Sequence, residues 1–333
     1  MIKQDDSLPL TSSHTRRSES AGYALLANRV VVRISGPGTD KFVQGQFTQH
    51  ADEVTASQSL RAAACSPKGR TYCLTRLVRD QQDLLMDLDA GQANAIISHL
   101  KKYLMLFRGT TMETLPSARI VGLLGTSAAI AAAGEKAQSL TQAGQVLPTG
   151  SGALIRLEDT LQGTARYEWW QFDGTPSLPA DLPERSIDDW NAASILAGVP
   201  WLTPESTDTY VPQMLNLQHL QGVHFKKGCY TGQEIIARMH FLGQLKKSLF
   251  RLGFVGTGTA PTTGTKLLSN GNSVGEVVNA VVTGDQQGEM LAVIRHDAQH
   301  GPLVLEGDEN VQLELKDLPY PVPERAPSLP TDT

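Results

Sequence analysis

The C-terminal third of the chain constrains the fold most, because it is a series of short strand-like segments. These segments are 249–255, 265–268, 273–282, 289–295, 302–306 and 310–316. Asn270-Gly271 lies between two of them and is a strong hairpin-turn signal. Short strands at regular spacing predict a small antiparallel β-barrel over residues 245–317.

The preceding part of the chain alternates strand-like and helical patterns. Strands are expected at 30–35, 62–65, 71–79, 84–88, 119–124, 153–157 and 166–172, and helices at 91–107 and 127–136. Ser186 and Asp189 form a capping-box pattern, so a further helix should begin there and end at Ala197. This alternation favours an α+β fold.

The composition excludes several classes of protein. At 333 residues the chain should form two or three domains, and its net charge of −5 gives no reason to expect stable coating of nucleic acid. The odd, sparse count of three cysteines, Cys65, Cys73 and Cys229, indicates no disulfide framework. One cysteine with His224 and His240 is a weak metal signal, so no stable metal site is expected. No secretory or membrane-spanning segment is evident, and a cytoplasmic protein is expected.

The most chemically dense stretch is Lys227-Gly228-Cys229-Tyr230-Thr231-Gly232-Gln233-Glu234, which we call the thiol motif. Its Thr-x-x-Glu pattern predicts a capping box and a helix start, with Cys229 just before the helix N-terminus. Unpaired N–H groups and the helix dipole there, with two adjacent lysines, would favour a thiolate. The alternative is a buried cysteine that only packs before an ordinary helix.

Several cations lie close to Cys229 in sequence. They are Lys226, Lys227, Arg238, Lys246 and Lys247. Such a run is either a solvated surface or a site for an anionic ligand, and the sequence leaves both readings open.

The thiol motif resembles the signature of the YgfZ family of folate-binding proteins, relatives of the glycine-cleavage aminomethyltransferase. The segment 211–216, Ala237-Arg238 and Gly243 also resemble that family, and weaker similarity extends from about residue 25 to 320. The resemblance implies a three-domain aminomethyltransferase-like ring. The expected parts are a disordered tail (1–20), a first folate-binding part (21–115), a second part with the motif (116–244), the barrel (245–317) and a proline-rich tail (318–333).

This chain departs from the aminomethyltransferases at positions that matter for catalysis. Those enzymes carry an aspartate pair where this chain has Cys73 and Leu74, and a pterin-binding glutamate where it has Leu196. Leucine cannot move a proton, so a classical enzyme is not expected. The alternative, a folate-dependent one-carbon transferase, would need another carboxylate from Asp80, Asp83 or Asp87.

The resemblance also implies roles for individual residues. Trp190 would stack on a reduced folate such as tetrahydrofolate, and Arg29 stands where the family has a second tryptophan. Lys227 or Arg238 would meet the glutamate carboxylates of the folate. Cys229 would be a reactive thiol supported by motif residues and the arginine that follows them, namely Lys227, Gly228, Tyr230, Gly232, Gln233, Glu234 and Arg238.

The family's role implies an accessory protein that supports assembly or repair of iron–sulfur clusters, and hence tRNA modification by iron–sulfur enzymes. Its expected partners are folate and iron–sulfur assembly proteins or cluster enzymes, such as tRNA-thiolating radical enzymes. A single thiol cannot replace the usual four cysteine ligands, so a stably held cluster is not expected.

Overall fold

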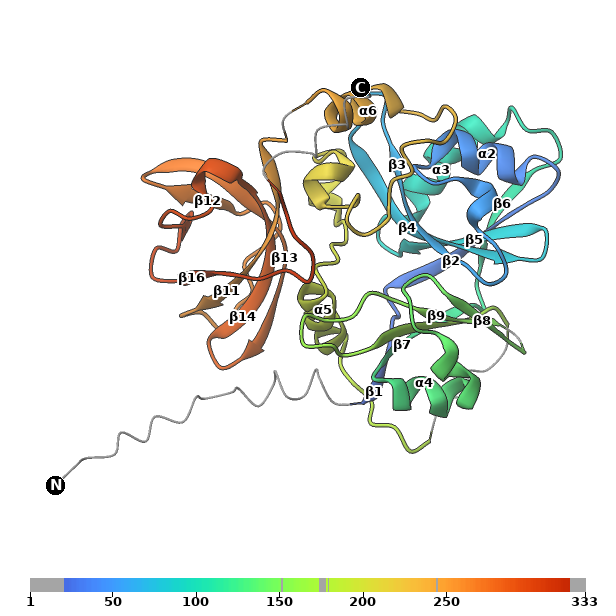
Figure 1. Ribbon diagram of the computed structural model, residues 1–333, viewed down its shortest axis with the longest axis horizontal. Coiled ribbons are helices and arrows are strands. Elements are labelled where there is room, and N and C mark those ends of the chain that lie inside the picture. Colours follow the sequence, from blue (N-terminus) through green and yellow to red (C-terminus); the bar gives the residue numbers. More distant parts are fainter. Residues whose placement is uncertain (1–20, 151, 174–177, 179, 244, 324–333) are drawn as a thin grey trace, which may run out of the picture.

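The computed structural model describes residues 21–150, 152–173, 178, 180–243 and 245–323. In Figure 1 three antiparallel sheets surround helix α5, with the C-terminal sheet on one side and the other two on the opposite side. The predicted disorder of residues 1–20 lies outside the described residues.

The first sheet, here the N-terminal sheet, has the strand order β3-β4-β5-β2-β6. Its strands are β2 (Arg29–Ser35), β3 (Leu60–Cys65), β4 (Thr71–Asp80), β5 (Asp83–Asp89) and β6 (Thr111–Leu115). Successive side chains point to opposite faces, so Val32 packs in the core under the helices and Val31 packs toward the second sheet. Helices α2 (Thr39–Gln46) and α3 (Ala93–Leu104) cover the first of these faces.

The second sheet, here the middle sheet, has the order β1-β7-β10-β9-β8. Its strands are β1 (Gly22–Leu25), β7 (Arg119–Leu124), β8 (Val146–Thr149), β9 (Gly152–Arg156) and β10 (Arg166–Gln171). Helix α4 (Thr126–Ala133) packs on one face, and a core that includes Ile120, Ile155 and Trp170 joins the other face to the N-terminal sheet.

The third sheet, here the C-terminal sheet, has six strands in the order β15-β12-β13-β14-β11-β16. Its strands are β11 (Lys247–Val255), β12 (Lys266–Ser269), β13 (Asn272–Gly284), β14 (Gln287–Arg295), β15 (Val304–Leu305) and β16 (Gln312–Lys316). Asn270 and Gly271 both have positive φ, as the predicted hairpin turn requires. The sheet curls, but its order leaves β15 and β16 as edges, so the predicted closed barrel is not confirmed.

Helix α5 (Ile187–Leu196) packs between the middle sheet and the C-terminal sheet. The predicted capping box is confirmed: Ser186 accepts from the Asp189 N–H, and the Asp189 carboxylate accepts from the Ser186 N–H. Helix α6 (Gln233–Phe241) follows the thiol motif. Short 3₁₀ turns complete the helical segments, at Ala51–Glu53, Glu135–Ser139, Pro204–Ser206, Pro212–Leu215 and His296–Ala298.

Two predicted helices are shorter than their sequence patterns. The helix expected at 91–107 ends at Leu104, and Met105 and Leu106 are largely exposed. The alanine-rich helix ends at Ala133, because Gly134 adopts a positive φ of 79° before the next turn.

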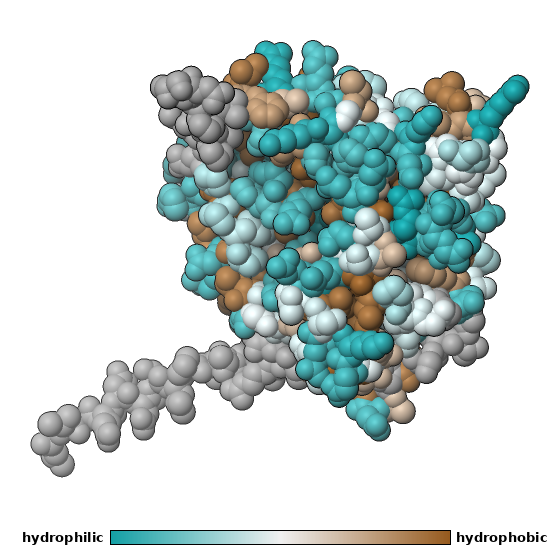
Figure 2. Space-filling view, turned by 45° about the vertical axis from the view of Figure 1, so that its right-hand side comes forward, coloured by the Kyte–Doolittle hydropathy of each residue, from teal (hydrophilic) through white to brown (hydrophobic). Residues whose placement is uncertain are grey.

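The surface in Figure 2 is mainly polar, with apolar residues in separate small areas. Within the described ranges, no helix combines the length and apolar character needed to cross a membrane.

Candidate functional site

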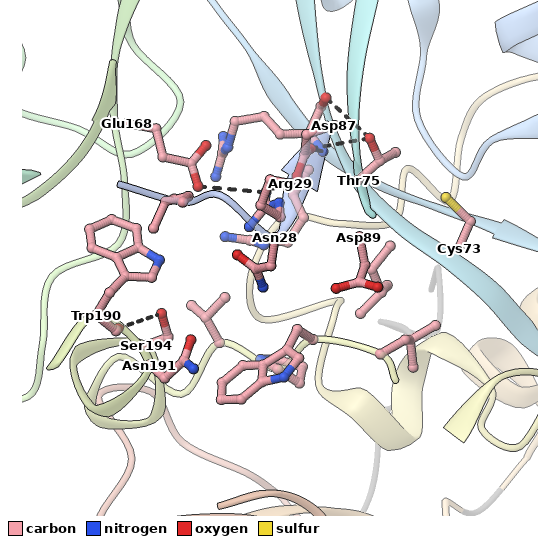
Figure 3. Close-up of a pocket in the computed structure, with 18 of the residues that line it drawn as sticks. Asn28, Arg29, Cys73, Thr75, Asp87, Asp89, Glu168, Trp190, Asn191 and Ser194 are labelled. Carbon is pink, nitrogen blue, oxygen red and sulfur yellow. Dashed lines mark hydrogen bonds and ion pairs between the residues drawn. The ribbon is translucent and has the colours of Figure 1, made fainter. Parts of the chain in front are cut away.

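A pocket lies where the N-terminal sheet, the middle sheet and α5 meet (Figure 3). Its walls come from the ends or edges of β2, β4, β5 and β10, from α5, and from the segment 199–202. Arg29 and Trp190, both predicted from the sequence as folate contacts, line it together. Cys73 and Leu74 also line it.

Trp190 occupies the first turn of α5 and is only 4% exposed. Its six-membered ring lies against Gly122 of β7, where an added Cβ would come within 2.5 Å of Cε3. The Arg166 guanidinium lies 4.7 Å from the ring centroid. Glycine at position 122 therefore makes room for the indole, and the Trp190 ring is already in contact with a cation before any ligand binds.

Buried and half-buried arginines and carboxylates form the polar wall of the pocket. They are Arg29, Arg61, Arg76 and Arg166 with Asp87 and Glu168. Glu158 lies outside the lining and pairs with Arg61 and Arg76. Burial lowers the pKa of Arg76 and Arg166 to about 10. Burial alone would raise the pKa of Glu158, but the charges of Arg61 and Arg76 outweigh it and lower that pKa to about 2. Arg76, Arg166 and Glu158 therefore stay ionised at neutral pH.

Arg29 begins β2 and reaches into this network. It forms an ion pair with Asp87, and its Nη2 lies 3.7 Å from Glu168 Oε1. Burial lowers the pKa of Arg29, and the Glu168 charge opposes that shift. Arg29 therefore neutralises carboxylates of the pocket wall, which explains a cation at this position.

A one-carbon transferase would need a carboxylate in the pocket, in place of the aspartate pair that Cys73 and Leu74 replace. Asp80 and Asp83 are not pocket residues and lie near Arg33. Asp87 does line the pocket, and besides pairing with Arg29 it accepts from the Arg76 N–H at 2.6 Å. These contacts favour the ionised form and occupy its oxygens, so Asp87 is a poor proton acceptor.

Sequence reasoning missed several pocket residues. Asn28, Asp89 and Asn191 line the pocket and surround its open centre in Figure 3. Trp201 contributes a second tryptophan to the lining. Trp201 directly follows Pro200, and no local sequence pattern marks it for a role in binding.

Lys227 is placed differently from the prediction. It is 5% exposed, and its Nζ donates to the carbonyl oxygens of Gln44, Phe47 and Gln49 at 2.7, 2.5 and 2.7 Å. An ammonium has three N–H donors, and all three are used. Lys227 does not line the pocket, so the structure does not support it as a contact for folate carboxylates.

The start of α6 also differs from the prediction. The capping box of Thr231 and Glu234 is wrong: Gly232 is the N-cap, with a φ of 83° and no side-chain cap. A Cβ at Gly232 would come within 2.6 Å of the Ser66 carbonyl oxygen, so the close approach of the two segments requires glycine. Gln233 contributes instead, because its Oε1 accepts from the Tyr230 N–H at 3.3 Å.

Cys229 is exposed, whereas Cys65 and Cys73 are buried. Burial raises the pKa of Cys65 to about 12 and raises that of Cys73 further. The helix begins one residue later than predicted, so Tyr230, Thr231 and Gly232 separate Cys229 from the first residue of α6. The thiol is accessible, but the helix dipole acts mainly within the first turn and does not explain a thiolate here.

The remaining motif residues divide by exposure. Tyr230 is buried, with the Lys227 Nζ 4.8 Å from its ring centroid, and burial raises its pKa. Glu234, Arg238 and Gly228 are exposed, and none of them lines the pocket. The predicted residues thus fall into two places: Trp190 and Arg29 in the pocket, and the motif outside it.

Among the described residues no group of three His, Cys, Asp or Glu side chains could hold a metal ion.

Comparisons with known proteins give the family of the chain. A scan against protein-family models finds no match. The tRNA-modifying protein YgfZ of Escherichia coli strain SMS-3-5 is 30% identical over 306 residues, covering 87% of this chain and 90% of that protein. The YgfZ protein of Colwellia psychrerythraea is 32% identical over 224 residues, 66% of this chain and 68% of that protein.

A solved structure is similar in fold. The glycine cleavage system aminomethyltransferase T from Bartonella henselae matches with a TM-score of 0.71 and 16% identity, over 94% of this chain and 89% of that one. The chain has an aminomethyltransferase-like fold and belongs to the YgfZ family of proteins.

Proposed function

We propose that this protein binds a reduced folate in the pocket between α5, the N-terminal sheet and the middle sheet, and that it supports tRNA modification. The observation that carries the proposal is the pocket itself, in which two tryptophans face a wall of ionised groups. The tryptophan rings favour stacking with a planar heterocycle. The arginines and carboxylates of the wall suit a ligand that has hydrogen-bond donors and acceptors on its ring and also carries carboxylates.

Specific groups in the pocket remain available to a folate. Asp89 accepts from the Gly91 N–H and forms no ion pair within the described part of the chain, so its carboxylate can accept from the amino-pyrimidine edge of a pterin. Arg76 is buried, and its Nη2 lies 3.7 Å from Glu158 Oε2 but has no hydrogen-bond partner among the described residues. It can donate to a pterin carbonyl or to a carboxylate.

The second part of the proposal concerns the exposed thiol. The E. coli relative is named as a tRNA-modifying protein. The family resemblance of the thiol motif is what suggests a connection with iron–sulfur clusters. Cys229 is the accessible cysteine of the three, so it is the one able to contact a client enzyme or its cluster. The cytosol is the proposed location, because the thiols require reducing conditions.

The folate proposal is tested by anaerobic titration of the purified protein with tetrahydrofolate, followed by calorimetry and tryptophan fluorescence. Saturable one-to-one binding below millimolar concentration supports it, and absence of binding refutes it. The thiol is tested by complementation of cells that lack the family protein. Cys229→Ala should fail to restore the activity of an iron–sulfur tRNA-modifying enzyme, while Cys65→Ala, which removes a buried thiol that does not line the pocket, should restore it.

A one-carbon transferase is the alternative function, and one observation favours it: of the three aspartates expected from the sequence, Asp80, Asp83 and Asp87, the last lines the pocket. Its ion pair with Arg29 weakens it as a base. Turnover of an aminomethyl or methyl donor with tetrahydrofolate, lost in Asp87→Asn, would establish this alternative.

A further inference from the structure

The segment 199–202 forms one wall of the pocket and is held in place from three sides. The side-chain amide of Asn279 accepts from the Trp201 N–H at 3.1 Å and donates to the Trp201 carbonyl at 3.0 Å. Gln92 Nε2 donates to the Leu202 carbonyl at 2.9 Å, and the Tyr320 hydroxyl donates to the Gly198 carbonyl at 2.5 Å. These anchors come from β13, from the start of α3 and from the C-terminal segment.

Asn279 owes its position to an irregularity in β13. The pairing of β13 with β14 shifts register between Val277 and Asn279, which marks a β-bulge. A bulge turns a side chain away from its regular direction, and bulges are common beside functional sites. Asn279 is 1% exposed, and both of its polar atoms are used on Trp201. Through these two hydrogen bonds, the buried Asn279 amide fixes the backbone of Trp201.

The two pocket tryptophans differ in what already touches their rings. Trp190 is almost fully buried against Gly122 and has the Arg166 guanidinium at its ring. Trp201 is only partly buried, and no aromatic ring or cation stacks on it within the described residues. The buried part of Trp201 packs against an apolar core that includes Val199 and Leu202, and its exposed part lines the pocket. A ligand ring can therefore stack on that exposed part without displacing an aromatic ring or a cation.

We propose that Trp201 is the tryptophan that stacks on the ring system of the bound folate, and that Asn279 is the positioning residue that holds it there. The inference rests on the proposed folate site and deepens it. It assigns to the C-terminal sheet a part in ligand binding, although that sheet supplies no side chain to the pocket lining. A rigid, pre-positioned aromatic group binds more tightly because less conformational freedom is lost on binding.

The test is tetrahydrofolate affinity, measured by calorimetry for a set of full-length variants. Trp201→Ala should weaken binding about tenfold or more, as stacked bases do on loss of their aromatic partner. Trp201→Phe should restore most of that affinity. Asn279→Leu should weaken binding severalfold, and Asn279→Asp, which keeps the acceptor but loses the donor, should lie between Leu and wild type.

The matched control is Thr263→Val. The Thr263 hydroxyl donates to the Val278 carbonyl at 2.9 Å, beside the same bulge but without contact to the pocket. This variant should bind folate like wild type, so it measures any general effect of loosening the strand. Urea unfolding of each variant then separates loss of stability from loss of affinity.

The outcomes distinguish the inference from the function on which it rests. If wild type binds folate and Trp201→Ala binds equally well, the folate site stands and the role of Trp201 is overturned. If Trp201→Ala is weak but Asn279→Leu binds like wild type, the positioning role of Asn279 is overturned. If wild type shows no saturable binding, both the proposed function and this inference fall.

Discussion

Lys227 offers the sharpest test of how the thiol motif is held. The perturbation is Lys227→Met, which keeps the length and much of the volume of the side chain but removes its ammonium. The three carbonyl acceptors belong to Gln44, Phe47 and Gln49, at and just beyond the C-terminal end of α2. Carbonyls at this end of a helix have no intrahelical partner and carry the negative end of its dipole.

The expected cost follows from these contacts. Hydrogen bonds to a charged donor contribute about 1.5–3 kcal/mol each, so three would sum to about 4.5–9 kcal/mol. Dehydrating a buried ammonium costs several kcal/mol, which offsets part of that sum. Burial lowers the pKa of Lys227 to about 7, while the three acceptors favour the charged form. We therefore expect Lys227→Met to lower the free energy of unfolding by about 3 kcal/mol.

The assay is urea unfolding at pH 7, followed by circular dichroism, with Lys226→Met as the control. Lys226 is the adjacent lysine and is exposed, so its replacement should change stability by less than about 0.5 kcal/mol. Folate affinity of folded Lys227→Met should match wild type. A stability loss below about 0.5 kcal/mol would refute the capping role, and a weaker folate affinity at unchanged stability would show that the ammonium reaches the ligand.

Three further perturbations follow from the structure. Glu158→Gln should reduce the acid sensitivity of folding: the depressed pKa of Glu158 gives stability that is present above about 4.5 and lost as pH falls toward about 2, worth roughly 3 kcal/mol in acid-unfolding curves. A thiol reagent should modify one cysteine per native chain, and Cys229→Ala should abolish that reaction. Gly122→Ala should cost about 1–3 kcal/mol and shift tryptophan emission, because its Cβ would collide with Trp190.

Each of these has an internal control. Asp159→Asn changes the neighbouring, more exposed carboxylate, and it should retain the acid sensitivity that Glu158→Gln reduces. Unfolding in urea should expose three thiols to the reagent instead of one. Gly258→Ala adds a methyl group where no atom lies within 4 Å, and it should leave stability unchanged. Equal effects of a variant and its control would contradict the corresponding prediction.

The sequence predicted the secondary structure well where a local pattern decides it. The Ser186 capping box and the Asn270-Gly271 turn are set by residues a few positions apart, and both are confirmed. The similar Thr231-x-x-Glu234 pattern failed because a distant segment prevails: Ser66 approaches Gly232 so closely that the helix begins after the glycine. Sequence spacing carries no information about that contact.

The pocket could be predicted only in part for the same reason. Trp190 and Arg29 were found by family resemblance, and both line the pocket. Trp201 and its support by Asn279 depend on a pairing between residues 78 positions apart, together with a bulge in β13. The ion pair of Arg29 with Asp87 likewise depends on neighbouring strands. Such long-range contacts have no signature in a single sequence.

The hairpin of β3 and β4 explains how the thiol motif affects a pocket that it does not line. The turn at 66–70 packs on α6, where a Cβ at Gly69 would come within 2.8 Å of the Ile235 Cβ. Four residues further along, Cys73 already lines the pocket, a distance of roughly 13 Å along an extended strand. Loss of folate binding in a motif variant is therefore no evidence of direct contact. Only a variant whose stability is unchanged can separate a ligand contact from a displaced hairpin, and for this reason the stability of Lys227→Met must be measured beside its affinity.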